Sequence, residues 1–149
     1  MAAIIGQGVT LRGYHFENWH LTFNLATGIT KDHEGRAVAL DSTGPNKVKL
    51  AGDGDPIIGR LEVVENRAQE GILVGTVALK FANRLPIAEG ETVAIGNSVQ
   101  GAGSGEVKAL PVTQDTDASG GAVNIVAASH NQRNVVVEVS GTYATVIQF

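Results

Sequence analysis

The sequence has 149 residues and a formal net charge of -4 at pH 7; 43% of its residues are hydrophobic, 17% are charged and 19 are glycine. An ordinary soluble domain has about 25% charged residues and about 7% glycine, so this composition is typical of one compact β domain rich in turns. Lysine and arginine total 11 against 15 acidic residues, which excludes a strongly electrostatic nucleic-acid surface. The absence of cysteine excludes disulfides and thiolate chemistry.

The first thirty residues differ from the rest of the chain in charge and in aromatic content. They hold only two charged side chains, Arg12 and Glu17. Four of the seven aromatic residues fall within ten positions here: Tyr14, Phe16, Trp19 and Phe23. Aromatic side chains are favoured both in cores and at interfaces, so the segment either folds over the β domain or extends onto a partner. We expect residues 1–10 to form an arm, and we divide the chain into an arm and aromatic segment, 1–30, and a single β domain, 31–149.

Short β-branched runs separated by turn residues follow, and no window of eleven or more residues has the apolar spacing of a helix. The predicted strands are residues 21–25, 36–40, 47–51, 57–65, 72–80, 91–95, 107–110, 123–127, 134–139 and 143–149. Residues 47–50 alternate basic and apolar, so Val48 and Leu50 are expected to face the core. Residues 72–79 are apolar on both faces, which predicts a central strand or one that contacts another subunit. The expected fold is all-β: a compact antiparallel β-barrel or sandwich with an extended N-terminal arm and no long helix.

The residues between these runs predict the connections. Gly96 and Asn97 indicate a two-residue hairpin turn between strands. Residues 101–105, with three glycines, predict a flexible tip before the strand at 107–110. Residues 66–70 have the composition of a single helical turn.

No stretch approaches the ~20 apolar residues of a membrane span, and the start of the chain lacks the features of a secretory signal. We therefore expect a soluble protein made in the cytoplasm, with no membrane and no nucleic acid among its partners.

Side chains of the metal-ligand types gather at four positions early in the chain: His15, His20, Asp32 and His33. His15 and His20 are five residues apart, a spacing that places them on one face of neither a helix nor a strand. Asp53 and Asp55 flank Gly54 as at the opening of a calcium loop, but no glutamate closes the loop at the twelfth position. We expect a plain turn there, a solvated His130, no metal and no cofactor.

Motifs of common catalytic sites are also missing. Residues 101–105 lack the Gly-Lys-Ser/Thr ending of a phosphate-binding loop, and no serine lies in a Gly-x-Ser-x-Gly elbow. Asp115 and Asp117 fall within residues 114–121, a polar stretch expected to be an exposed loop, where both carboxylates stay solvated. We therefore expect that the protein is not an enzyme.

A series of glycine-and-valine runs covers about half of the chain. It comprises residues 35–40, 48–51, 56–64, 71–77 and 88–99, and includes Ile-x-Gly-x-Leu at 57–61, Gly-x-x-Val at 71–74 and Gly-Glu-x-Val-x-x-Gly-x-x-Val at 90–99. The series, followed by a glycine-rich hairpin, resembles the small capsid cement (head decoration) proteins of tailed bacteriophages. The first thirty residues and the segment after Pro111 fall outside the resemblance.

The resemblance implies a structural role on the virion rather than catalysis. Such proteins bind the outside of the expanded head, commonly as homotrimers at threefold or quasi-threefold positions, and clamp neighbouring subunits of the major capsid protein. An arm that adds a strand to the edge of a capsid sheet would supply backbone hydrogen bonds with little demand on its sequence. The candidate capsid-binding residues are the apolar and aromatic side chains of the N-terminal segment: Ile4, Ile5, Val9, Tyr14, Phe16 and Trp19.

A second hypothesis comes from the polar stretches at 114–121 and 129–134. Exposed polar loops on a β domain are compatible with a glycan- or receptor-binding module displayed on the virion. A glycan-array signal that is lost when these loops are shortened would favour the glycan-binding module. The absence of any signal would favour the cement protein.

Overall fold

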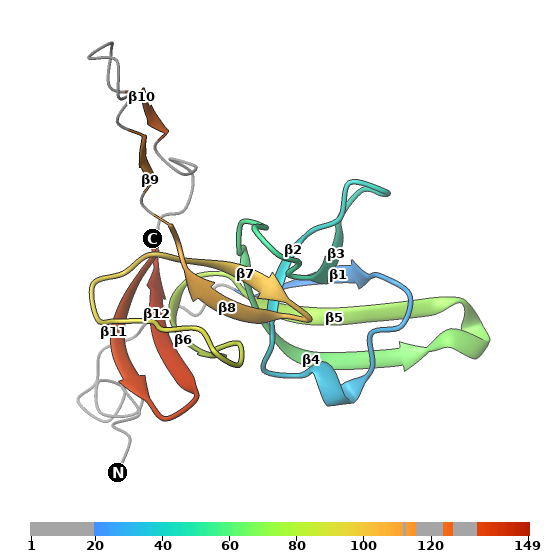
Figure 1. Cartoon of the computed structure of the whole chain (residues 1–149). Coiled ribbons are helices and arrows are strands. Elements are labelled where there is room, and N and C mark those ends of the chain that lie inside the picture. The colour runs from blue at the N-terminus through green and yellow to red at the C-terminus, as the bar shows by residue number, and fades with distance from the viewer. Residues whose placement is uncertain (1–19, 112, 116–123, 127–133) are drawn as a thin grey trace.

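The structure, a computed structural model, describes residues 20–111, 113–115, 124–126 and 134–149. Its first five strands form a closed barrel in the order β1, β3, β2, β4, β5. These strands are β1 (His20–Leu25), β2 (Ala37–Leu40), β3 (Lys47–Leu50), β4 (Gly59–Arg67) and β5 (Ile72–Ala78). Neighbouring strands pair antiparallel, except for a parallel pair between β1 and β3. The all-β class is thus confirmed, and the barrel lies to one side of the sheet that contains β6, β11 and β12 (Figure 1).

The barrel is filled by alternate side chains of its strands, as a half-buried strand requires. Val48 is fully buried and Leu50 packs partly buried against the same core, as their alternation predicts. The barrel core consists of Phe23, Leu25, Ile29, Val38, Val48, Leu61, Val64 and Val77. Strand β5 pairs with both β1 and β4, which confirms the prediction of a central strand.

Gly75 of β5 lies buried within this barrel. A Cβ added there would lie 2.9 Å from Leu61 Cδ1 and 3.0 Å from Leu25 Cδ1. The carbonyl oxygen of Val63 would also lie 2.9 Å away, and real Cβ atoms essentially never come closer than 3.0 Å to such neighbours. Glycine in a strand often marks such a close approach. Glycine at this position therefore lets two leucines fill the middle of the barrel.

The second half of the protein packs a three-stranded sheet and a hairpin around another core. The sheet has the order β11, β12, β6, and the hairpin pairs β7 with β8. Their bounds are β6 (Phe81–Pro86), β7 (Val99–Gly103), β8 (Glu106–Ala109), β11 (Asn134–Ser140) and β12 (Tyr143–Gln148). The second core contains side chains from the sheet and from the hairpin, among them Leu85, Val99, Val107, Val136 and Val146. In Figure 1 the short pair of β9 (Thr113–Asp115) and β10 (Asn124–Val126) stands apart from these layers.

Buried amides connect the second sheet to the barrel. Asn83 of β6 donates through Nδ2 to the carbonyl of Ala78 at 3.2 Å and to Oε1 of Gln148 at 2.9 Å. Gln148 Nε2 in turn donates to the carbonyl of Ile57 at 3.3 Å. Because buried polar groups are costly unless paired, these bonds fix how β6 and β12 sit against the end of β5.

The described helical residues form two 3-10 turns, η1 (Lys31–His33) and η2 (Ala68–Glu70). The second falls within the helical turn predicted at 66–70, of which residues 66 and 67 instead end β4. None of the helices in the described ranges is long and apolar enough to cross a membrane.

Two predictions for residues 91–97 are wrong. Residues 91–95 form no strand, and Gly96 and Asn97 do not join two strands. The Asn97 side chain accepts the N–H of Ala94, while the backbones of Gly96 and Asn97 bond to Val136 of β11. The backbone N–H and C=O groups of this segment are therefore already hydrogen-bonded and do not pair across a hairpin.

The glycine-rich stretch 101–105 is not a loose tip either. Gly101 and Gly103 belong to β7, and the turn falls at Ser104 and Gly105. Gly101 is buried where a Cβ would overlap the carbonyl oxygen of Gly52. Glycine here permits a close backbone approach rather than flexibility.

Candidate functional site

The residues that the sequence singles out as capsid-binding all lie outside the described residues: Ile4, Ile5, Val9, Tyr14, Phe16 and Trp19. Their role stays a prediction, as does the expectation of an arm at residues 1–10. Within the described part of the chain, two features of the surface have the properties of a binding site. They are a set of exposed apolar side chains and a groove.

Large apolar side chains are exposed at seven described positions: Leu21, Leu40, Val63, Ile95, Val139, Tyr143 and Phe149. Leu40 is 61% exposed, Val63 53% and Ile95 70%. Single exposed apolar residues are ordinary on soluble proteins. They indicate a binding site only where they lie beside one another or beside a groove. Val139 and Tyr143 are the two that also line the groove.

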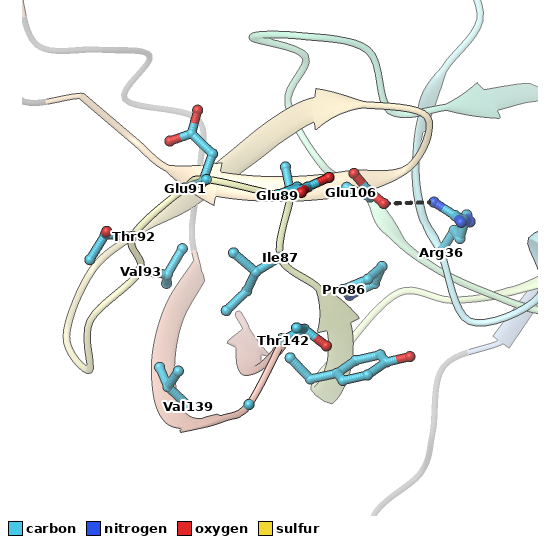
Figure 2. A pocket seen from close by; sticks show the side chains of 14 residues that line it. Arg36, Pro86, Ile87, Glu89, Glu91, Thr92, Val93, Glu106, Val139 and Thr142 are labelled. Atoms are coloured by element: carbon cyan, nitrogen blue, oxygen red, sulfur yellow. Dashed lines mark hydrogen bonds and ion pairs between the residues drawn. The ribbon is translucent and has the colours of Figure 1, made fainter.

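The groove has a volume of about 760 Å³ and lies between the segment after β6, strand β8 and the turn that joins β11 to β12. In Figure 2, Ile87 lies between Glu89 on one side and Val139 and Thr142 on the other. A volume of this size is within the range of sites that take ligands or short chain segments.

Backbone hydrogen bonds hold the walls of the groove in place. The N–H of Ile87 donates to the carbonyl of Thr142 at 2.8 Å, and that of Ala88 donates to the carbonyl of Val107 at 3.0 Å. Both walls turn on glycines in the left-handed region, Gly90 with φ of 81° and Gly141 with φ of 60°. Such angles are accessible to glycine at no steric cost. The two glycines therefore allow the tight turns that border the groove.

Acidic groups outnumber basic ones around the groove. Its charged lining residues are three carboxylates and one guanidinium: Glu89, Glu91, Glu106 and Arg36. Arg36 Nη1 is already engaged, since it donates to the carbonyl of Ser104 at 2.9 Å and to Oε1 of Glu106 at 3.3 Å. Glu89 and Glu91 are exposed, and neither takes part in an ion pair within the part of the chain that the structure describes. The groove therefore combines an apolar lining with a rim of net negative charge, although Glu91 is close enough to Lys108 to raise the pKa of that lysine.

Tyr143 stands at the start of β12 with part of its ring exposed. The guanidinium carbon of Arg84, on the neighbouring strand β6, lies 4.3 Å from the ring centroid. This distance is within the range of cation–π attraction. The contact holds the Tyr143 side chain against β6 while 40% of the residue remains accessible beside the groove.

One described member of the histidine and aspartate cluster, His33, has a local structural role. His33 Nδ1 accepts the N–H of Thr30 at 3.0 Å and lies 3.2 Å from its hydroxyl oxygen, which closes the turn at η1. No group of three or more His, Asp or Glu side chains placed to hold a metal ion occurs in the ranges that the structure describes. His15 and His130 lie outside those ranges.

The Asp53 and Asp55 turn is held by lysines. Lys49 Nζ lies 2.8 Å from Asp55 Oδ2, which also accepts the N–H of Gly52 at 2.8 Å. The hydrogen bond from Lys49 lowers the pKa of the Asp55 carboxyl and raises that of the lysine. Asp53 pairs with Lys108 at 2.6 Å, and this hydrogen bond, together with the charges of Asp53 and Glu91, raises the pKa of Lys108. As predicted, this run forms a turn, with its carboxylates engaged by lysines.

Comparison with known proteins gives no match, either to a family model or to a curated protein.

The groove was not predicted from the sequence. Arg36 and Glu106 are 70 residues apart, and the turn at Val139 to Tyr143 is further along the chain. Only the turn glycines, with the acidic residues at 89 and 91, give a local signal. That signal indicates an exposed loop and does not indicate what the loop faces.

Proposed function

We propose that this protein is a phage head decoration protein that binds the outer surface of the expanded capsid and stabilises contacts between major capsid protein subunits. Its partner is the major capsid protein, and its working form is a homo-oligomer, with a trimer favoured. Its place is the outer surface of the virion.

One observation carries the proposal. The glycine-and-valine runs that resemble the cement proteins also contain three of the most exposed large apolar side chains of the described residues: Leu40, Val63 and Ile95. Leu40 and Val63 belong to β2 and β4 of the barrel, and Ile95 to the loop before β7. Binding of a partner over these exposed side chains would be favourable, because burial of apolar surface contributes about 25 cal/mol per Å².

The rigidity of the framework also suits a clamp. The barrel is closed, and buried amides fix the second sheet against it. A protein that holds two capsid subunits together must transmit force without unfolding, and a sheet without free edges in its central barrel resists local opening. Stable interfaces bury roughly 800 Å² on each partner, an area that an arm together with the apolar surface of the body would supply.

Binding to heads tests the proposal. Expanded heads that lack the protein are mixed with purified wild-type chain, and bound protein is measured by co-sedimentation. Deleting residues 2–13 should abolish binding while the far-ultraviolet circular dichroism of the β domain is retained. Unchanged binding by the folded, truncated chain would rule out the arm, and absence of binding by the wild-type chain would rule out the function.

A second comparison tests the apolar surface. Val63→Lys replaces an exposed apolar side chain of β4, and Gln69→Lys is its control at an exposed polar position beyond the Arg67 end of β4. Loss of about 1 kcal/mol of apolar burial corresponds to about a five-fold weaker affinity for heads. Binding by Val63→Lys as tight as that of the wild-type chain would show that Val63 lies outside the interface.

A further inference from the structure

The groove has no part in the proposed function, yet its chemistry is specific. Ile87 and Val139 give it an apolar lining, and Glu89 and Glu91 leave negative charge on its rim without an ion-pair partner among the described residues. An occupant that fits such a groove is an extended chain with apolar side chains, one cation and little other charge.

A segment of this composition precedes β1 in the same chain. Between Val9 and Trp19 the charged side chains are Arg12 and Glu17, and the others include Leu11, Tyr14 and Phe16. Arg12 thus stands among apolar and aromatic residues, five positions from the only acid of the segment. Its guanidinium is suited to the two carboxylates of the rim, because arginine binds carboxylates with a planar set of donors.

The connection to β1 brings this segment within reach of the groove. His20 pairs with Ala78, whose carbonyl accepts the side chain of Asn83 in β6. Pro86, three residues further along β6, lines the near end of the groove, so the path from His20 to that end is on the order of 20 Å, at ~3.3 Å per strand residue plus two spacings of about 4.8 Å. Arg12 precedes His20 by eight residues, which span at most about 28 Å when extended.

We propose that the groove beside β6 and β12 holds the segment around Arg12 of the same molecule in the free protein, with the guanidinium between Glu89 and Glu91. The side chains of Leu11 and Tyr14 cover the apolar lining at Ile87 and Val139. This inference is independent of the proposed function, because it concerns the isolated protein.

Disulfide trapping tests the proposal without background, since the chain has no cysteine. Thr10→Cys is combined with Thr142→Cys in the groove, and the matched control combines Thr10→Cys with Gln69→Cys. Gln69 follows the Arg67 end of β4, which pairs with Ile72 at the end of the barrel away from Ala78. Both full-length proteins are oxidised at low micromolar concentration, and the products are separated without reductant and weighed by mass spectrometry.

The expected result is an intramolecular disulfide that forms roughly ten-fold or more faster in the groove pair than in the control, because docking raises the effective concentration above that of a free tether. Equal rates for the two pairs would overturn the proposal. Disulfide-linked dimers alone would overturn it as well, since they would assign the groove to the segment of a second copy.

A charge exchange supplies an independent readout. Adding Arg12→Glu to the groove pair, or Glu89→Lys with Glu91→Lys, should each slow trapping by about two- to five-fold, as expected for exposed ion pairs. Combining the three substitutions should restore the rate, because the pairing is then reversed. Failure of the combined variant to recover, with circular dichroism unchanged, would exclude the proposed contact.

Discussion

Gly59 is the glycine of the Ile-x-Gly-x-Leu run, and the structure gives a physical reason for it. The residue opens β4 and is buried beside the end of β5. A Cβ built on Gly59 overlaps the carbonyl oxygen of Ala78 and lies 2.7 Å from Val77 Cγ1. Both neighbours belong to β5, and the first is backbone, so no side-chain rotation relieves the overlap. Gly59→Ala therefore forces β4 and β5 apart where the barrel meets β6.

The cost follows from this geometry. Overpacking a well-filled core costs about 1–3 kcal/mol and occasionally more, and a clash with backbone places Gly59→Ala near the upper end. For a chain of this length each kcal/mol lowers Tm by about 2–4 °C, so we expect a loss of about 3 kcal/mol and a fall in Tm of roughly 6–12 °C.

Urea denaturation followed by far-ultraviolet circular dichroism measures this loss. Gly44→Ala is the matched control, because a Cβ there lies 3.5 Å from Lys47 Cδ, an ordinary contact, and its φ is outside the left-handed region. The control should be neutral or more stable by about 0.5 kcal/mol, since alanine reduces the entropy of the unfolded chain. Similar midpoints for the two variants would refute the steric reasoning.

Three further outcomes are expected. Asn83→Leu should lower the free energy of unfolding by about 1–3 kcal/mol, because it leaves Oε1 of Gln148 buried without its donor; a calorimetric Tm equal to that of the wild type would contradict this. Asp55→Ala should cost no more than about 1 kcal/mol at pH 7, since its partner Lys49 is well exposed. The lowered pKa of Asp55 stabilises the folded state above the ordinary carboxyl pKa of about 3.9, and this contribution is lost as the pH falls through the lowered value. The gap between the urea midpoints of the wild type and Asp55→Ala should therefore narrow as the pH falls below about 4, and a gap that is the same at pH 7 and at pH 2 would count against the ion pair. Tyr143→Leu should remove the ring beneath Arg84 and weaken the fold by about 0.5–1 kcal/mol, and an unchanged urea midpoint would show that the contact contributes nothing.

Strands with regular alternation or dense β-branched residues could be predicted from the sequence. The run at 72–78 is an example, because its β-branched residues form β5, which pairs with β1 at one edge and with β4 at the other. Strands β6 and β7 could not be predicted in the same way. Buried Asn83 in β6 breaks the apolar pattern, and its amide is satisfied by Gln148, a residue distant in sequence. Gly101 in β7 suggests a flexible loop until the close backbone of Gly52 explains it.

The candidate site was less accessible from the sequence than the fold. The groove forms where Arg36 and Glu106 meet the β11–β12 turn, and each part comes from a different region of the chain. Local composition marks the turn at Gly141 but carries no information about the side chains that face it. The capsid-binding residues expected at 4–19 lie outside the described residues, so that part of the hypothesis depends on experiment.

A low-resolution image of expanded heads, with and without the purified protein, would show whether the chain decorates the capsid. We expect added density on the outer surface at threefold or quasi-threefold positions, present with the full chain and absent after deletion of residues 2–13. Heads that look the same with and without the full chain would contradict this expectation.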